Sequence, residues 1–166
     1  MFVVYGIIAL LLIHAIMFWV NKITANIKKN SLLKSQANSY HLWFQIFAMW
    51  VRNIHKKKSI SDYLIENNYK NIAIYGAGAV CELVCEELDK SEVSVVYLID
   101  QNACFPEISK EIVELDIICV DDIPDQKKID AIIVTPVYDF NRVRKKIIRT
   151  TSEIPVISLD QIIYSL

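Results

Sequence analysis

The stretch NIAIYGAGAVC, residues 71–81, decides the fold. An uncharged, mostly apolar run leads into Gly76, and a helical pattern begins just after Gly78. In a strand–turn–helix unit, the first glycine makes the tight turn and the second lets the backbone come close to a phosphate. The amino end of the helix adds unpaired N–H groups and a positive dipole, which favour an anion. The stretch therefore predicts a phosphate-binding turn.

Two further positions, Cys81 and Asp100, bear on how this motif is interpreted. The third glycine that normally permits close packing of helix and strand is replaced by Cys81, so the helix is expected slightly farther from the strand. Asp100 follows Gly76 by 24 residues, at the end of the next apolar run. An acidic side chain there can accept hydrogen bonds from ribose hydroxyls. The pattern favours a nucleotide-binding site. The alternative is a domain that has the fold but no longer binds a nucleotide, and that serves to dock partner proteins.

Apolar runs and helical patterns alternate along residues 59–166. Because the apolar runs show no in–out alternation, both faces of the sheet are expected to be covered by helices. This predicts an α/β fold: a Rossmann-like, doubly wound parallel sheet of about five strands in the order 3-2-1-4-5. Ser59 and Asp62 match a capping box, and Asp139 is expected to cap a later helix. The expected strands are 71–75, 93–99, 117–120, 130–135 and 155–158, and the expected helices are 61–67, 79–89, 139–149 and 159–164.

Residues 1–20, MFVVYGIIALLLIHAIMFWV, contain no charged side chain. As a helix they would be about 30 Å long, the thickness of a bilayer's hydrocarbon core. No Lys or Arg precedes the segment, and its end is bulky, which favours a retained transmembrane anchor over a cleaved signal peptide. The alternative is an apolar helix that packs on a partner protein. The lysines after the segment predict a single-pass protein of the bacterial inner membrane, with residues 59–166 facing the cytoplasm.

Residues 21–58 are interpreted as a basic linker, with a polar stretch at 30–39, followed by an amphipathic juxtamembrane helix at 40–54. Residues 1–61 hold eight Lys and Arg and no Asp or Glu, which suits anionic membrane lipid. The aromatic helix at 40–54 fits the membrane interface or a cap on the soluble domain, and these two readings are compatible. The same charges carry no nucleic-acid module signature, so no nucleic-acid partner is expected.

The sequence offers no catalytic or metal-ligating set. No histidine follows His55, no Tyr-x-x-x-Lys pair is present, and no C-x-x-C pair occurs. General acid–base chemistry near neutral pH would depend on Asp or Glu alone. Cys81 and Cys85 share a helical face and are interpreted as packing residues, with a redox or metal role as the alternative. The cysteine spacing suggests no disulfide framework, which fits a reducing compartment.

The segments IAIYGAGAV, ELDKSEVSVVYLIDQNA, DDIP, DAIIVTP and VISLDQII, in this order, resemble the Rossmann-like nucleotide-binding domains of bacterial surface-polysaccharide proteins. Such domains belong to nucleoside-diphosphate-sugar epimerase/dehydratases, to related sugar transferases, and to the amino-terminal part of some sugar acyltransferases. The resemblance covers residues 58–166. It implies NAD(H) or a nucleotide-sugar as ligand and glycan-biosynthesis enzymes as partners.

The resemblance also implies roles for individual residues. Four backbone positions of the glycine turn would hold phosphate, Asp100 and Asn102 would hold ribose or base, and Thr135 and Pro136 would line the same crevice. The four turn positions are Gly76, Ala77, Gly78 and Ala79. The chain departs from the family at Cys81, in lacking a catalytic domain and hexapeptide repeats after the nucleotide-binding part, and in having one membrane span where several are common.

Three functions are therefore open at this stage. The first is a membrane-anchored module that binds a nucleotide or nucleotide-sugar and serves polysaccharide or glycan synthesis. The second is a docking module for partner enzymes without a ligand. The third is a small NAD-dependent oxidoreductase or epimerase, which the missing acid–base pair disfavours.

Overall fold

The computed structural model describes residues 2–101, 103, 115–151 and 153–166; for residues 2–13, 15, 16 and 125 it describes the backbone alone. The chain divides into two compact units, Met1–Phe44 and Gln45–Leu166. Helix α1 (Phe2–His55) contributes residues to both units. The second unit contains all other described helices and strands.

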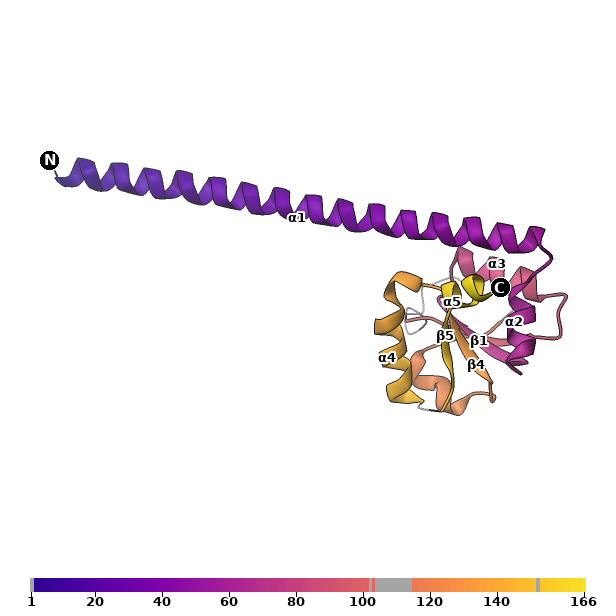
Figure 1. The fold of residues 1–166 in the computed structure, drawn as a ribbon. Helices are drawn as coiled ribbons and strands as arrows, with labels where there is room; N and C mark the ends of the chain where they lie inside the picture. Colours follow the sequence, from indigo (N-terminus) through magenta and orange to yellow (C-terminus); the bar gives the residue numbers. More distant parts are fainter. Residues whose placement is uncertain (1, 102, 104–114, 152) are drawn as a thin grey trace. The chain divides into compact units, whose positions relative to one another are not determined.

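The second unit is built on a parallel sheet of five strands in the order β3-β2-β1-β4-β5 (Figure 1). This is the predicted 3-2-1-4-5 arrangement, and it makes the unit Rossmann-like. Strand lengths differ from expectation by only a few residues. The strands are β1 (Asn71–Tyr75), β2 (Ser94–Ile99), β3 (Ile117–Ile118), β4 (Ala131–Val134) and β5 (Val156–Ser158).

Helices lie on both faces of the sheet, as the apolar strands require. One face packs against α4 (Phe140–Thr150) and the 3-10 helix η1 (Val120–Asp125), with Val143 and Ile147 of α4 buried in that cluster. Alternate strand residues, such as Ile72 and Ile74, point to the other face and are fully buried. That face is covered by helices that contribute their own buried apolar residues: α2 (Ile60–Glu66), α3 (Ala79–Leu88) and α5 (Leu159–Ser165).

The two predicted helix caps have different outcomes. Ser59 caps α2 as expected: its hydroxyl accepts from Asp62 N, and Ser59 N donates to the Asp62 carboxylate at 2.7 Å. Asp139 stands at the N-cap position of α4 but makes no side-chain cap. Its carboxylate instead accepts from Arg142 Nε at 2.9 Å and forms an ion pair with that guanidinium. The long Arg142 side chain competes successfully for the acid that the capping pattern assigned to the backbone.

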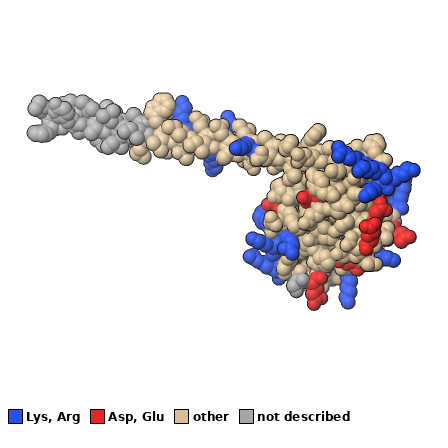
Figure 2. All heavy atoms as spheres, in the orientation of Figure 1, with Lys and Arg blue, Asp and Glu red and all other residues tan. Residues whose placement is uncertain are grey.

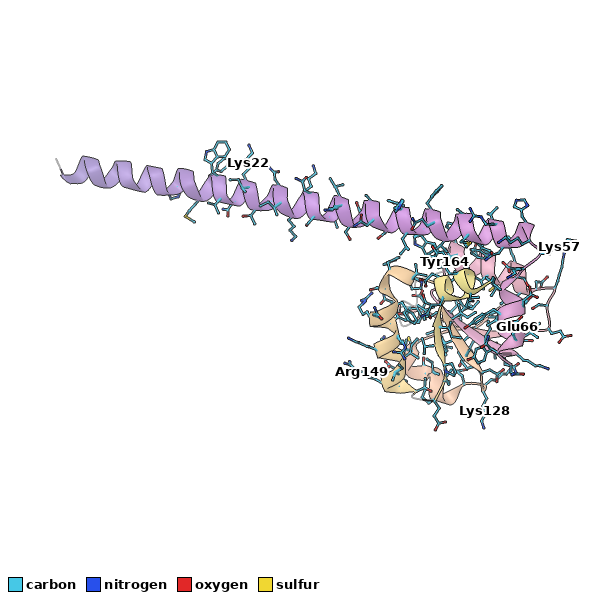
Figure 3. The ribbon with its side chains drawn as sticks, viewed as in Figure 1. Lys22, Lys57, Glu66, Lys128, Arg149 and Tyr164 are labelled. Atoms are coloured by element: carbon cyan, nitrogen blue, oxygen red, sulfur yellow. The ribbon has the colours of Figure 1, made fainter. Side chains whose placement is uncertain are left out.

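Helix α4 has one apolar face and one basic face. It carries Arg or Lys at five of its eleven positions and no acid. Lys and Arg side chains gather over this part of the second unit in Figure 2. Figure 3 shows Arg149 of this helix, and Lys128 of the loop before β4, pointing outward. The basic face is therefore solvated in the isolated chain.

Residues 30–39, interpreted above as a linker, belong to helix α1. The stretch is polar but contains neither glycine nor proline, so nothing in it ends a helix. Within the residues searched, no helix combines the length and hydropathy needed to cross a bilayer. The span predicted for residues 1–20 falls mainly on side chains outside the described set, residues 1–13, 15 and 16. It therefore stays a prediction.

The last part of α1 belongs to the second unit and packs on the other helices of that unit. Ile46, Trp50 and Asn53, at helical spacing, are buried there. Asn53 Nδ2 donates to Ile163 O of α5 at 2.7 Å, and Trp50 Nε1 donates to the Glu87 carboxylate of α3. For the part of the predicted 40–54 helix from Ile46 onward, the interpretation as a cap on the domain at 59–166 is therefore confirmed. The compatible reading, contact with a membrane interface, is untested.

Candidate functional site

The candidate site lies at the carboxyl edge of the sheet, between β1 and β4. Here the strand order reverses, because β2 and β3 lie on one side of β1 and β4 and β5 on the other. Crevices at such switch points are where open α/β sheets bind ligands. Gly76 N donates to Ile99 O at 2.8 Å, and Thr135 N donates to Tyr75 O at 3.0 Å. The ends of β1, β2 and β4 are thereby joined around the glycine turn.

Gly76 is required by the fold itself. Its φ of +100° lies in the region that glycine adopts at little cost. A Cβ there would stand 2.6 Å from Thr135 Oγ1 and 3.0 Å from Pro136 Cδ. Thr135 is held in place, since its buried hydroxyl donates to Tyr75 O at 3.0 Å. The predicted site residues Thr135 and Pro136 therefore do lie beside the turn, and they explain its first glycine without any ligand.

Gly78 has a different environment. It is the N-cap of α3, its backbone is extended with φ −136°, and a Cβ would meet no atom within 4 Å. The residue is exposed. The open space beside Gly78 is what close approach of a phosphate would require. Because the chain would tolerate a side chain here, Gly78 is the position at which ligand binding can be tested with little damage to the fold.

Part of the turn's hydrogen-bonding capacity is already used. Ala77 N donates to Asp100 Oδ2 at 3.0 Å, and Gly78 N donates to Gly76 O at 3.0 Å. Within the described chain, the amides of Ala79 and Val80 make no hydrogen bond. These two first-turn donors of α3 are thus available to an anion. Ala79 was among the predicted phosphate-binding residues and Val80 was not, although a helix start always leaves several N–H groups unpaired.

Asp100 lies where the sequence placed it, half-buried at the end of β2 and beside the glycine turn. Asn102, the other residue assigned to ribose or base, lies outside the described residues. Asp100 also acts electrostatically on Tyr75, the last residue of β1. Burial raises the pKa of Tyr75 above its usual value, and Asp100 and Asp139 add to that increase while Arg142 opposes it. Tyr75 is therefore protonated at neutral pH.

Arg142 is a second residue that sequence reasoning did not assign to this region. It lies in the first turn of α4 and is close enough to Tyr75 to influence its titration. Its pairing with Asp139 neutralises much of its charge. A cation following β4 could have been suspected, because β4 ends at the same edge as β1 and β2. Its neighbours could not be read from the sequence.

The cysteines have three different environments. Cys81 is fully buried under the glycine turn, which confirms the packing interpretation for that residue. Cys85 is only half-buried, and both are free thiols. Cys119 is disulfide-bonded, so the expectation of no disulfide is wrong at this position. Spacing along the chain could not show it, since pairing depends on two Cα atoms lying within about 7 Å. In the described part of the chain, no three His, Cys, Asp or Glu side chains gather as metal ligands would.

No protein-family model and no curated protein sequence matches the chain. Among solved structures, it is similar to one described as a myo-inositol dehydrogenase from Sinorhizobium meliloti. The sequences are 17% identical, and the TM-score is 0.41. The match covers 54% of this chain and 27% of that chain, so it involves about a quarter of the bacterial protein.

Proposed function

We propose that the second unit binds the phosphates of a nucleotide, either NAD(H) or a nucleotide-sugar, at the carboxyl edge of its sheet. The observation that carries the proposal is the open space beside Gly78, next to the unpaired amides of Ala79 and Val80. A phosphate placed there would accept these hydrogen bonds and lie on the positive end of the α3 dipole. The amide of Ala77 is not part of this proposed phosphate site, because it already donates a hydrogen bond to Asp100.

Asp100 supports a preference for an unmodified ribose. A carboxylate in this position accepts hydrogen bonds from ribose hydroxyls and repels a 2′-phosphate. NAD(H) and nucleotide-sugars carry such a ribose, whereas NADP(H) does not. Binding of NAD(H) over NADP(H) is accordingly part of the proposal.

We also propose a cellular setting, on sequence grounds. Residues 1–20 would anchor the chain in a bacterial inner membrane, the second unit would face the cytoplasm, and the bound nucleotide would serve partner enzymes of polysaccharide or glycan synthesis. The uncharged segment, the lysines that follow it and the resemblance described above support this. The disulfide at Cys119 is an observation against a cytoplasmic location of the second unit, because cytoplasmic thiols are usually kept reduced.

Binding is tested by thermal unfolding of the full chain in detergent with NAD(H), NADP(H), CoA, and UDP- and GDP-sugars. A ligand at a hundred times its Kd adds about 2.7 kcal/mol to the free energy of unfolding. We expect stabilisation by NAD(H) or a nucleotide-sugar, and loss of that stabilisation in Gly78→Val. The Leu83→Val variant, on the exposed side of the same helix, is the matched control and should respond like the wild type.

The setting is tested separately. Alkaline carbonate should leave the chain in the membrane pellet, and deletion of residues 1–20 should release it. Protease added to spheroplasts should spare Lys56, Lys57 and Lys58, and protease added to inverted vesicles should cut there. Cleavage in spheroplasts would reverse the proposed topology without affecting the proposal about nucleotide binding.

A docking module without a ligand is the second candidate, and one observation favours it. The amides of Ala77 and Gly78 are satisfied inside the chain, by Asp100 and Gly76, so this part of the turn is complete without a nucleotide. If no nucleotide at millimolar concentration shifts the unfolding temperature of the wild type, this candidate replaces the first.

A further inference from the structure

Helix α1 is exposed on every side along residues 17–38. Most of the stability of a helix in a protein comes from packing of an apolar face, and this part of α1 has no such packing. It nevertheless continues a helix whose large apolar side chains are in many places more than half exposed. Between residues 23 and 54 these exposed side chains are Ile23, Ile27, Leu32, Leu33, Tyr40, Phe44, Val51 and Ile54.

Six of these eight side chains lie on one stripe of the helix. Counting from Ile23, the stripe advances by three and four residues in strict alternation. Its ten positions are Ile23, Asn26, Asn30, Leu33, Ala37, Tyr40, Phe44, Phe47, Val51 and Ile54. None of the ten is charged, and eight are apolar. A repeat of this spacing over more than three heptads is typical of a coiled coil, in which the stripe of one helix packs on that of another.

The stripe avoids the side of α1 that the second unit covers. Trp50 and Asn53 are buried against other helices of that unit. Val51 and Ile54, the next residue along in each case, lie on the stripe and are 52% and 55% exposed. Phe47 is partly covered, since its ring stacks on that of Trp50. A second helix could therefore pack along the stripe without displacing Trp50 or Asn53.

We propose that the occupant of this stripe is a second copy of the chain, and that the two α1 helices form a parallel coiled coil. Two copies present the same stripe, so the contact is self-complementary and closes after two chains. Asn30 occupies an a position of the heptad and faces Asn30 of the second copy. A polar residue at an a position fixes the register and the number of chains in parallel coiled coils.

The area of this contact is of the size that a stable dimer needs. Aromatic side chains bury about 150–250 Å² each, and each copy contributes the exposed Tyr40 and Phe44. The exposed aliphatic members of the stripe add to this in both copies. The contact thus reaches the order of the roughly 1,200–2,000 Å² that specific interfaces bury.

The charges beside the stripe predict how the dimer responds to salt. In the parallel register, Lys29 at a g position lies beside Lys34 at an e position of the second copy. These like charges oppose association, and salt screens them. The dimer is therefore expected to tighten as the salt concentration rises. Contact of the same lysines with an anionic lipid surface or an acidic protein would instead weaken.

The first experiment locates the contact by disulfide cross-linking of the full chain in detergent micelles. Asn30→Cys puts a thiol on the stripe, and Ser35→Cys puts one on the opposite side of the helix. The wild type, whose described free thiols are Cys81 and Cys85, gives the background. On mild oxidation, Asn30→Cys should give several times the yield of reducible dimer that Ser35→Cys gives. Equal yields from the two variants, or no dimer from either, would overturn the proposal.

The second experiment tests by charge reversal that the partner is a second copy. Lys29→Glu converts both contacts with Lys34 from repulsion to attraction, so self-association should tighten several-fold, as measured by energy transfer between labelled chains. Lys28→Glu makes the same change of charge at an f position, away from the stripe, and should stay close to the wild type. An affinity of Lys29→Glu no higher than that of Lys28→Glu, or association of the wild type that weakens as salt rises, would show that the proposal is wrong.

Discussion

The Asp100 carboxylate accepts a hydrogen bond from Ala77 N at 3.0 Å, which joins the acid at the end of β2 to the turn at the end of β1. Two residues 23 positions apart thus form one unit of the candidate site. The carboxylate is oriented by the turn before any ligand arrives. The same contact occupies a donor that a phosphate could have used, so the phosphate site proposed above depends on the amides of Ala79 and Val80.

Two substitutions of Asp100 distinguish the effect of its negative charge from the effect of its hydrogen bond to Ala77 N. In Asp100→Asn the amide oxygen can still accept from Ala77 N, whereas Asp100→Ala removes the acceptor. If NAD(H) is the ligand, Asp100→Ala should weaken binding by about 1.5–3 kcal/mol, the value of hydrogen bonds to a charged group. Asp100→Asn should weaken NAD(H) binding by less than this, and it should reduce the ratio of the affinity for NAD(H) to that for NADP(H). Isothermal titration of the three proteins with both nucleotides measures this; equal affinities throughout would remove Asp100 from the site.

The two turn glycines should respond in opposite ways to a methyl group. Gly76→Ala forces a positive φ on alanine and a contact with Thr135, so it should lower the free energy of unfolding by about 2 kcal/mol or more. Gly78→Ala meets open space and should change stability by less than about 1 kcal/mol. If the space holds a phosphate, only Gly78→Ala should weaken nucleotide binding at unchanged stability. Urea unfolding with and without ligand gives both quantities, and a severe loss of stability in Gly78→Ala would contradict this reading.

Glu87 is expected to stabilise the packing of the last part of α1 within the second unit. Its carboxylate accepts from Trp50 Nε1 of α1 and from Ile60 N of α2, the latter at 2.6 Å. Glu87→Gln replaces one acceptor oxygen by a donor that faces another donor, so it should cost about 1.5–3 kcal/mol. The neighbouring Glu86 is exposed, and Glu86→Gln is the control, expected within about 0.5 kcal/mol of the wild type. Similar losses in the two variants, measured by urea unfolding, would show that the contact does not stabilise the fold.

Tyr97 offers a stabilising substitution. It is 3% exposed, and its hydroxyl has no hydrogen-bond partner among the described residues. An unsatisfied buried polar group costs about 1–3 kcal/mol, so Tyr97→Phe should raise the midpoint of urea unfolding. Tyr138→Phe, at an exposed position, should leave it unchanged. A loss of stability in Tyr97→Phe would mean that the hydroxyl is bonded in solution, for example to ordered water.

The strands and helices of the second unit, and the order of its strands, follow from local sequence patterns. Short apolar runs rich in β-branched residues favour buried strands, the intervening amphipathic runs favour helices, and short connections between them allow few topologies. The glycine turn was predicted from its place between a strand and a helix, and Asp100 from its spacing of 24 residues after Gly76, at the end of the next apolar run. The bounds of β1 were predicted correctly, whereas the other four strands are shorter than predicted, since pairing with a neighbour decides where a strand ends.

The apolar pattern of residues 40–54 was less informative. Trp50 is buried, yet the apolar side chains of Val51 and Ile54 in the same stretch are about half exposed, at 52% and 55%. The buried face includes the polar Asn53, whose amide finds Ile163 O. Helical spacing identifies a face, but which face is buried depends on the partner that covers it.

By itself, the sequence determined the class of fold, the strand order, the place of the glycine turn and the position of Asp100 beside it, because each depends on local propensity and on the geometry of parallel strands. Only the tertiary structure decided that Thr135 leaves no room for a Cβ at position 76, that Asp100 accepts from the Ala77 amide, and that Cys81 is fully buried while Cys85 is half-buried. Each of these depends on which atoms meet when distant segments pack, and hydrogen bonds and close contacts are decided by distances of a few tenths of an ångström. Spacing along a chain does not contain that information.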